Sequence, residues 1–192
     1  MGGDEVHFQA NGLPLSMIII HAVQKLLNTS RLKAPLYVSE ASPSQVLHHW
    51  YARLVSTGFP GKLLVMYMHD PSGLTILVHG KSIQSTHFYF KDRLFKLMGR
   101  LGFSQNFIER EIYFQEEGYV VGKTDSRSML GRMNQLNYVL EYQCSKAASY
   151  EELPLSWMED QIAEYFYQDP VTKKYRYLID YFIELGVVER KP

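Results

Sequence analysis

The chain has 192 residues, which is enough for one domain with a full hydrophobic core and a small appended segment. Lys plus Arg equals Asp plus Glu, at 20 each, so the composition gives no overall attraction to nucleic acid or to an anionic membrane. The single cysteine, Cys144, excludes an internal disulfide framework and a multi-cysteine zinc site, and it favours a reducing cytoplasm.

The amino-terminal part begins with residues 1–16, which lack the basic start and apolar core of a signal peptide. We interpret them as a flexible extension of a domain that starts at Met17. Met17–Ala22 is an apolar, β-branched run that predicts a short buried strand, and Val23–Leu27 predicts the opening of a helix. Such apolar runs are far too short to cross a bilayer, so no membrane association is expected.

Three strand-like segments follow a loop predicted over Thr29–Ser44: Trp50–Ser56, Lys62–His69 and Leu74–His79. The segments between them are short and rich in Gly and Pro. Turns of that length join antiparallel neighbours, so the sequence predicts a three-stranded meander.

The middle of the chain predicts two helices, Phe88–Leu101 with Gly102 as its stop, and Ser104–Glu111. Ile112–Gln115 and Tyr119–Lys123 then flank a short polar turn, which suggests another hairpin or an irregular strand pair.

A long helix is predicted next, with Asp125 or Ser126 as its amino-terminal cap and its end near Ser145. Two further helices are predicted over Pro154–Tyr167 and Lys174–Leu185. The fold class is therefore α+β: a small antiparallel sheet, made of the meander and the amino-terminal strand, packed with helices. We divide the chain into residues 17–148 as the core domain and 149–192 as a carboxy-terminal helical segment packed on it.

The predicted helix after Asp125 contains residues that are unfavourable at their positions in a helix. Apolar residues recur along it at helical spacing and predict a buried stripe: Met129, Met133, Leu136 and Leu140. A second stripe holds Arg127, Gly131 and Asn134. Gly inside a helix costs about 1 kcal/mol relative to Ala, and Arg in the first turn opposes the helix dipole. Such exceptions concentrate at functional or strained sites, so we look for function here.

Three segments carry a family resemblance: Met17–Leu27, Trp50–Leu54 and Arg127–Gln135. Together they resemble a bacterial domain of unknown function (DUF6933-like) that is similar to the amino-terminal part of some proteins described as like the plasmid pRiA4b ORF-3 product. The resemblance covers about Met17 to Leu185. It implies no established activity, and only a loose association with mobile genetic elements.

The family pattern at the long helix has Ser and Asp where this chain has Arg132 and Gln135. A role that requires that Asp, such as a metal ligand or a general base, is therefore not expected here.

Two interpretations of the long helix remain open. In the functional one, Arg127, Ser128, Gly131 and Asn134 form a face that binds an anion or a partner, using the helix amino terminus and the guanidinium group. In the structural one, Arg127 pairs with a buried carboxylate, Gly131 permits close contact with the sheet, and Asn134 satisfies strand carbonyls. Trp50 is a further ligand-binding candidate, although a core position is the commoner place for it.

The seven histidines show no helical metal-binding spacing, so no metal and no cofactor is assigned. His69 and His79 end adjacent predicted strands and could approach one another as a general acid and base, with Arg127 stabilising a phosphate. Histidines at the sheet edge, in solvent or bound to turns, are the commoner outcome. We therefore assign no catalytic residue.

The preferred function is a non-enzymatic binding or regulatory module that recognises a protein partner or a small anionic ligand through Arg127, Ser128 and Asn134. The alternative is a small phosphodiesterase or nuclease-like enzyme that uses His69 or His79 with Arg127. Aromatic residues near the carboxy terminus form helical stripes typical of core or subunit contacts, and the neutral net charge disfavours nucleic acid. The oligomeric state is not predicted.

Overall fold

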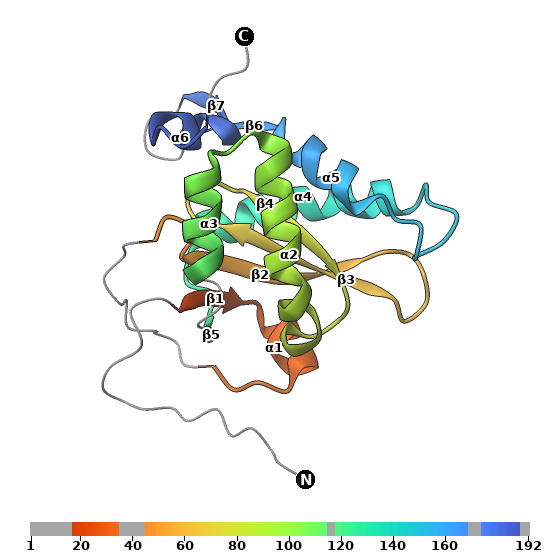
Figure 1. Cartoon of the computed structure of the whole chain (residues 1–192). Helices are drawn as coiled ribbons and strands as arrows, with labels where there is room; N and C mark the ends of the chain where they lie inside the picture. The colour runs from red at the N-terminus through yellow and green to blue at the C-terminus, as the bar shows by residue number, and fades with distance from the viewer. Residues whose placement is uncertain (1–16, 35–44, 115–117, 169–173, 189–192) are drawn as a thin grey trace.

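The computed structural model describes residues 17–34, 45–114, 118–168 and 174–188 (Figure 1). The strands of the main sheet are β1 Ile18–Ala22, β2 His49–Ser56, β3 Leu63–His69, β4 Thr75–His79 and β5 Tyr119–Lys123. The helices are α1 Gln24–Ser30, α2 Ile83–Leu101, α3 Gln105–Phe114, α4 Arg127–Cys144, α5 Leu155–Ala163 and α6 Leu178–Glu184. Two short strands, β6 Phe166–Gln168 and β7 Tyr175–Tyr177, form a separate ribbon.

The main sheet has the strand order β4-β3-β2-β1-β5. The antiparallel meander β2-β3-β4 is confirmed, but β1 runs parallel to both of its neighbours, so the sheet is mixed. Strand β1 is buried along its whole length, which matches its continuous apolar run and its place between parallel partners. The α+β class is therefore confirmed, with parallel pairing added at one side of the sheet.

Helices cover both faces of this sheet. Figure 1 shows α2 and α3 in front of the sheet and α4 behind it. Alternate residues of each strand face opposite sides, so Trp50 packs with α2 while Tyr51 faces α4. The chain thus builds two apolar clusters, one on each face.

The carboxy-terminal segment wraps from one face to the other. Helix α5 contributes Met158 and Ile162 to the cluster under α4, whereas α6 contributes Phe182 to the cluster under α2. The buried Glu159 carboxylate of α5 accepts the Leu77 backbone N–H of edge strand β4 at 2.9 Å. This contact satisfies part of an otherwise unpaired strand edge.

The predicted hairpin around residues 112–123 is wrong. Residues 112–114 continue helix α3, and β5 pairs in parallel with β1 instead of with the preceding segment. Gln115 lies outside the described residues. A parallel partner far away in the sequence leaves no short-range turn signal, so local patterning could not find it.

Three of the predicted helices also differ from the structure in their bounds. Helix α2 starts at Ile83 because the Ser82 side chain accepts the Ser85 backbone N–H and caps it. The helix predicted over Lys174–Leu185 is a strand, β7, followed by the short α6. Likewise the helix predicted over Pro154–Tyr167 ends at Ala163, and the chain enters β6.

None of the helices in the described part of the chain combines the length and the apolar character that crossing a bilayer requires.

Candidate functional site

Helix α4 begins at a capped turn directly after β5. The Ser126 side chain accepts the Met129 backbone N–H at 3.2 Å, so Ser126 is the amino-terminal cap. Met129 and Met133 point inward and are buried against the sheet. The predicted buried stripe is thus present, and it fixes which side of α4 faces solvent.

The outward side of α4 begins with Arg127, Ser128 and Gly131, all exposed. A Cβ atom added to Gly131 would meet nothing within 4 Å, so close packing against the sheet does not explain this glycine. Within the described residues, the Arg127 side chain makes no hydrogen bond and no ion pair. The structural interpretations of Gly131 and Arg127 are therefore wrong for the described part of the chain.

Asn134 lies one turn further along the same side and is exposed. Its side-chain oxygen accepts a hydrogen bond from the Arg53 guanidinium of β2. The contact is with another side chain and not with a strand carbonyl. Arg53 thereby adds a second guanidinium beside the face formed by Arg127, Ser128, Gly131 and Asn134, which we call the outer face of α4.

Arg132, in contrast, is held by the turn between β3 and β4. Its guanidinium donates to the Pro71 carbonyl at 2.8 Å and the Ser72 carbonyl at 3.1 Å, and it lies 4.0 Å from the centre of the Tyr167 ring. Gly73 makes room for it, because a Cβ there would sit 2.0 Å from Nη2 of Arg132. Gly73 also has a φ of +82°, which favours glycine.

A polar cluster that the sequence did not reveal lies beside the start of α4. His21 Nε2 is 3.3 Å from His49 Nδ1, and His21 Nδ1 is 3.2 Å from the Lys123 carbonyl. The Tyr51 hydroxyl donates to Asp125 at 2.5 Å, and its ring stacks on His21 with centroids 4.8 Å apart. Residues from β1, β2 and the β5–α4 connection therefore meet in one place.

The protonation pattern of this cluster follows from its contacts. Because a carbonyl only accepts, His21 Nδ1 is the donor in its contact with the Lys123 carbonyl. Burial, followed by the hydrogen bond to Asp125, raises the pKa of Tyr51. That hydrogen bond is also the main cause that lowers the pKa of Asp125. Tyr51 is thus held as a hydrogen-bond donor and Asp125 as an acceptor.

Asp70 lies between this cluster and Arg132. Burial raises the pKa of its carboxyl group, and the nearby His49 and Arg132 oppose that rise. Within the described residues, no three His, Cys, Asp or Glu side chains converge so as to hold a metal ion. The arrangement can orient a polar ligand by hydrogen bonds, with donors from the histidines and acceptors from the two carboxylates.

Sequence reasoning missed His21, His49, Tyr51 and Asp125 because they are far apart in the chain. One signal was available: His21 interrupts an otherwise apolar, fully buried strand. A polar residue inside such a run usually has a specific partner. No comparable local signal marks Tyr51, since alternating aromatic residues are ordinary in a strand.

Trp50 does not line this site. Its side chain is fully buried on the opposite face, where the indole N–H donates to the Leu47 carbonyl at 3.0 Å and the ring meets Phe90 edge-on. The core interpretation of Trp50 fits this position, and its inclusion among ligand-binding residues does not.

His69 and His79 do not approach one another. Strands β3 and β4 are antiparallel, so His79 pairs with Leu64 at the far end of the hairpin from His69. His69 is fully buried and is bonded to Ser72 at 2.7 Å and to the Val46 carbonyl at 2.9 Å. Burial lowers its pKa to about 3. The prediction that the two histidines approach one another is wrong, because two neighbouring antiparallel strands end at opposite ends of their hairpin.

The Cys144 side chain is also inaccessible to solvent. It is buried in the cluster under α4, and burial raises the pKa of its thiol to about 11. A thiol in that state is not a ready nucleophile at neutral pH.

The chain was compared with known protein families and with curated proteins. The curated proteins give no match. One family model matches residues 19–180, which span β1 to α6 and include α4 with its outer face and the polar cluster beside it. The chain therefore belongs to the family described as Domain of unknown function (DUF6933).

Proposed function

We propose that this protein is a non-enzymatic binding module that recognises an anionic group through the outer face of α4. One observation carries the proposal: Gly131 is exposed inside a helix with open space around it, beside Arg127, which has no partner among the described residues. Neither residue contributes to packing there, although the glycine weakens the helix. A ligand that needs close approach to the backbone would account for both.

The start of α4 suits an anion. The backbone N–H groups of its first turn carry partial positive charge, and the Arg127 guanidinium can pair with a carboxylate or phosphate in a bidentate manner. Asp125 precedes this turn, but its carboxylate is bound to Tyr51.

The position in the fold also supports a ligand site. After β1 the chain enters α1 on one face of the sheet, whereas after β5 it enters α4 on the opposite face. Ligands commonly bind at the carboxyl ends of parallel strands where successive connections diverge in this way. Arg127 and Ser128 stand at that end of β5.

The outer face continues along α4 to Tyr138, whose side chain is 73% exposed. Arg and Tyr are the residues most enriched at the centres of protein interfaces. This continuation favours a protein that carries the anionic group over a free ion, and the two sources can be separated by experiment. We do not propose the phosphodiesterase alternative, because it requires His69 or His79 beside Arg127. His69 is buried in the cluster under α2, and His79 lies at the opposite end of the β3–β4 hairpin, bonded to the Tyr150 carbonyl.

Thermal-shift measurements on wild type and Arg127→Ala test the proposal. The ligands are inorganic phosphate, nucleotides, short RNA, acidic peptides and divalent metals. We expect an anionic ligand to raise the melting temperature of wild type and not of a folded Arg127→Ala protein, since a ligand stabilises the state that binds it. Lys25→Ala, which removes an exposed charge from α1, is the matched control and should respond like wild type.

An absent shift in wild type for every ligand would contradict the proposal. So would an equal shift in wild type and Arg127→Ala.

A further inference from the structure

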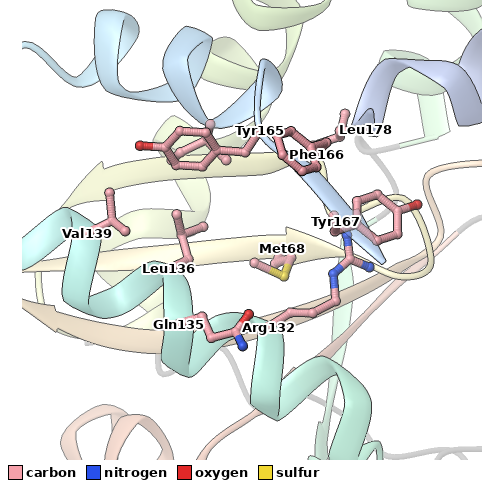
Figure 2. A pocket seen from close by; sticks show the side chains of 11 residues that line it. Met68, Arg132, Gln135, Leu136, Val139, Tyr165, Phe166, Tyr167 and Leu178 are labelled. Carbon is pink, nitrogen blue, oxygen red and sulfur yellow. The ribbon is translucent and has the colours of Figure 1, made fainter. Parts of the chain in front are cut away.

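A small pocket lies between α4 and the segment that leads from α5 into β6 (Figure 2). Met68 and Leu136 form its floor, and Tyr165, Phe166 and Tyr167 stand opposite them. Its volume is about 160 Å³. An apolar cavity of about 150 Å³ accommodates benzene, so this pocket has room for one aromatic ring.

The walls of the pocket are exposed although they are aromatic. Phe166 is 63% exposed and Tyr165 is 44% exposed. Large aromatic side chains left in solvent around a concavity are typical of an interaction site. The Met68 thioether adds a soft, polarisable contact for an aromatic ring.

One end of the pocket is polar and already fixed. Arg132 is bonded to the Pro71 and Ser72 carbonyls and stacks on Tyr167, so its position does not depend on a ligand. Gln135, from the next turn of α4, is exposed and makes no side-chain hydrogen bond within the described residues. Its amide offers both a donor and an acceptor at the rim.

We infer that this pocket receives one aromatic side chain, best a tyrosine, from an acidic peptide segment of a partner protein. The ring would pack among the aromatic walls and the guanidinium plane, and its hydroxyl would bond to Gln135. The inference rests on the proposed function, because the acidic group of the same segment would bind Arg127.

The spacing along α4 specifies the segment. Arg127 and Gln135 are separated by about 12 Å along the helix axis, at 1.5 Å per residue, and by about 80° around it, at 3.6 residues per turn. The long Arg127 side chain therefore has to reach around the helix toward a peptide that occupies the pocket. An extended peptide covers about 13 Å in four residues. An acidic residue followed four positions later by tyrosine therefore reaches both places, whereas one small metabolite is too short to do so.

Methyl NMR on the full chain tests the pocket first, with p-cresol as a tyrosine side-chain analogue. We expect saturable shifts of the Leu136, Val139 and Ile162 methyl groups, which line the pocket. Val139→Trp should abolish these shifts by filling the space, and Phe166→Ala should weaken them by removing a wall. Phe88→Ala removes an aromatic ring that is 82% exposed on α2 and should leave them unchanged.

The second arm uses the peptide acetyl-Asp-Ser-Ala-Ser-Tyr-amide. Replacing its aspartate by asparagine should weaken binding about threefold, as for an exposed ion pair, and Arg127→Ala should erase that difference. Replacing its tyrosine by alanine should remove the pocket shifts.

The p-cresol experiment and the peptide experiment contradict different parts of the inference. If p-cresol does not shift the pocket methyl groups of wild type, or shifts those of Leu136 and Ile162 as strongly in Val139→Trp as in wild type, the pocket assignment is overturned, whatever Arg127 binds. If p-cresol binds but aspartate gives no advantage over asparagine in wild type, the linked acidic partner is overturned, while the thermal-shift comparison of wild type and Arg127→Ala decides separately whether Arg127 binds an anion.

Discussion

Arginine side chains on the two sides of α4 have different surroundings. On the side toward the β3–β4 turn, Arg132 is held by two carbonyls and an aromatic ring, and Gly73 leaves space for it. On the outer side, Arg127 projects into solvent beside a glycine that no contact requires. An arginine on a helix therefore indicates a function only through the residues that surround it. One arginine is part of the architecture, and the other has the surroundings of a recognition group.

The largest expected effect lies on the buried side of α4. Met133 is fully buried against the sheet, so Met133→Ala should lower the free energy of unfolding by about 2–5 kcal/mol through lost burial and a residual cavity. Urea denaturation monitored by circular dichroism would measure it. A loss as small as that of a surface substitution would show that α4 is not packed as described.

Arg132→Ala should lower the free energy of unfolding by about 2 kcal/mol, because it removes charge-assisted hydrogen bonds to two turn carbonyls. The same urea titration measures this loss. Arg132→Lys is a useful second variant: it keeps the charge but not the fork that reaches Pro71 and Ser72 together, so it should recover only part of the loss.

Tyr51→Phe should cost about 1 kcal/mol by deleting the hydrogen bond to Asp125. The pH dependence has a definite sign. Since Tyr51 lowers the pKa of Asp125 in the folded protein, the stabilisation is present above the ordinary aspartate pKa and is lost as pH falls through the lowered value. Wild type and Tyr51→Phe should therefore converge in acid, as followed by thermal melts from pH 7 downward. A constant difference over that range would contradict this account.

Gly131→Ala should raise the free energy of unfolding by up to about 1 kcal/mol, since alanine favours a helix and the added methyl group meets no atom. The same substitution should weaken ligand binding if the ligand approaches the helix backbone there. Chemical denaturation and a binding titration on one preparation would check both. Destabilisation by alanine would point to a packing role for Gly131.

Much of the fold follows from local patterns. The alternation of Trp50 and Tyr51 across the sheet, the short turns of the meander and the apolar stripe of α4 all carry signals within a few residues. Strand β5 could not be placed in this way, because its partner β1 lies about a hundred residues earlier and pairs in parallel. The prediction that His69 and His79 approach one another is wrong because β3 and β4 are antiparallel. The two strands end at opposite ends of their hairpin, and each histidine is the last residue of its strand.

The candidate site, too, could be predicted from the sequence only where its signal is local. The oddity of Arg127 and Gly131 was visible because a helix has rules that single residues can break. The cluster of His21, Tyr51 and Asp125 is harder to predict: His21 is unusual in its apolar strand, but Tyr51 and Asp125 are ordinary in their own segments, and only the fold brings the three together. The fixed position of Arg132 depends on Gly73, which lies in the β3–β4 turn and leaves room for the guanidinium group.

The most direct test compares two single substitutions in the absence of any ligand: Arg127→Ala and Arg132→Ala, each measured by equilibrium urea unfolding against wild type. The account predicts that Arg127→Ala stays within about 0.5 kcal/mol of wild type, as a surface change does, while Arg132→Ala is clearly destabilised. If Arg127→Ala loses as much stability as Arg132→Ala, the outer face of α4 is part of the architecture, and its assignment as a recognition surface is wrong.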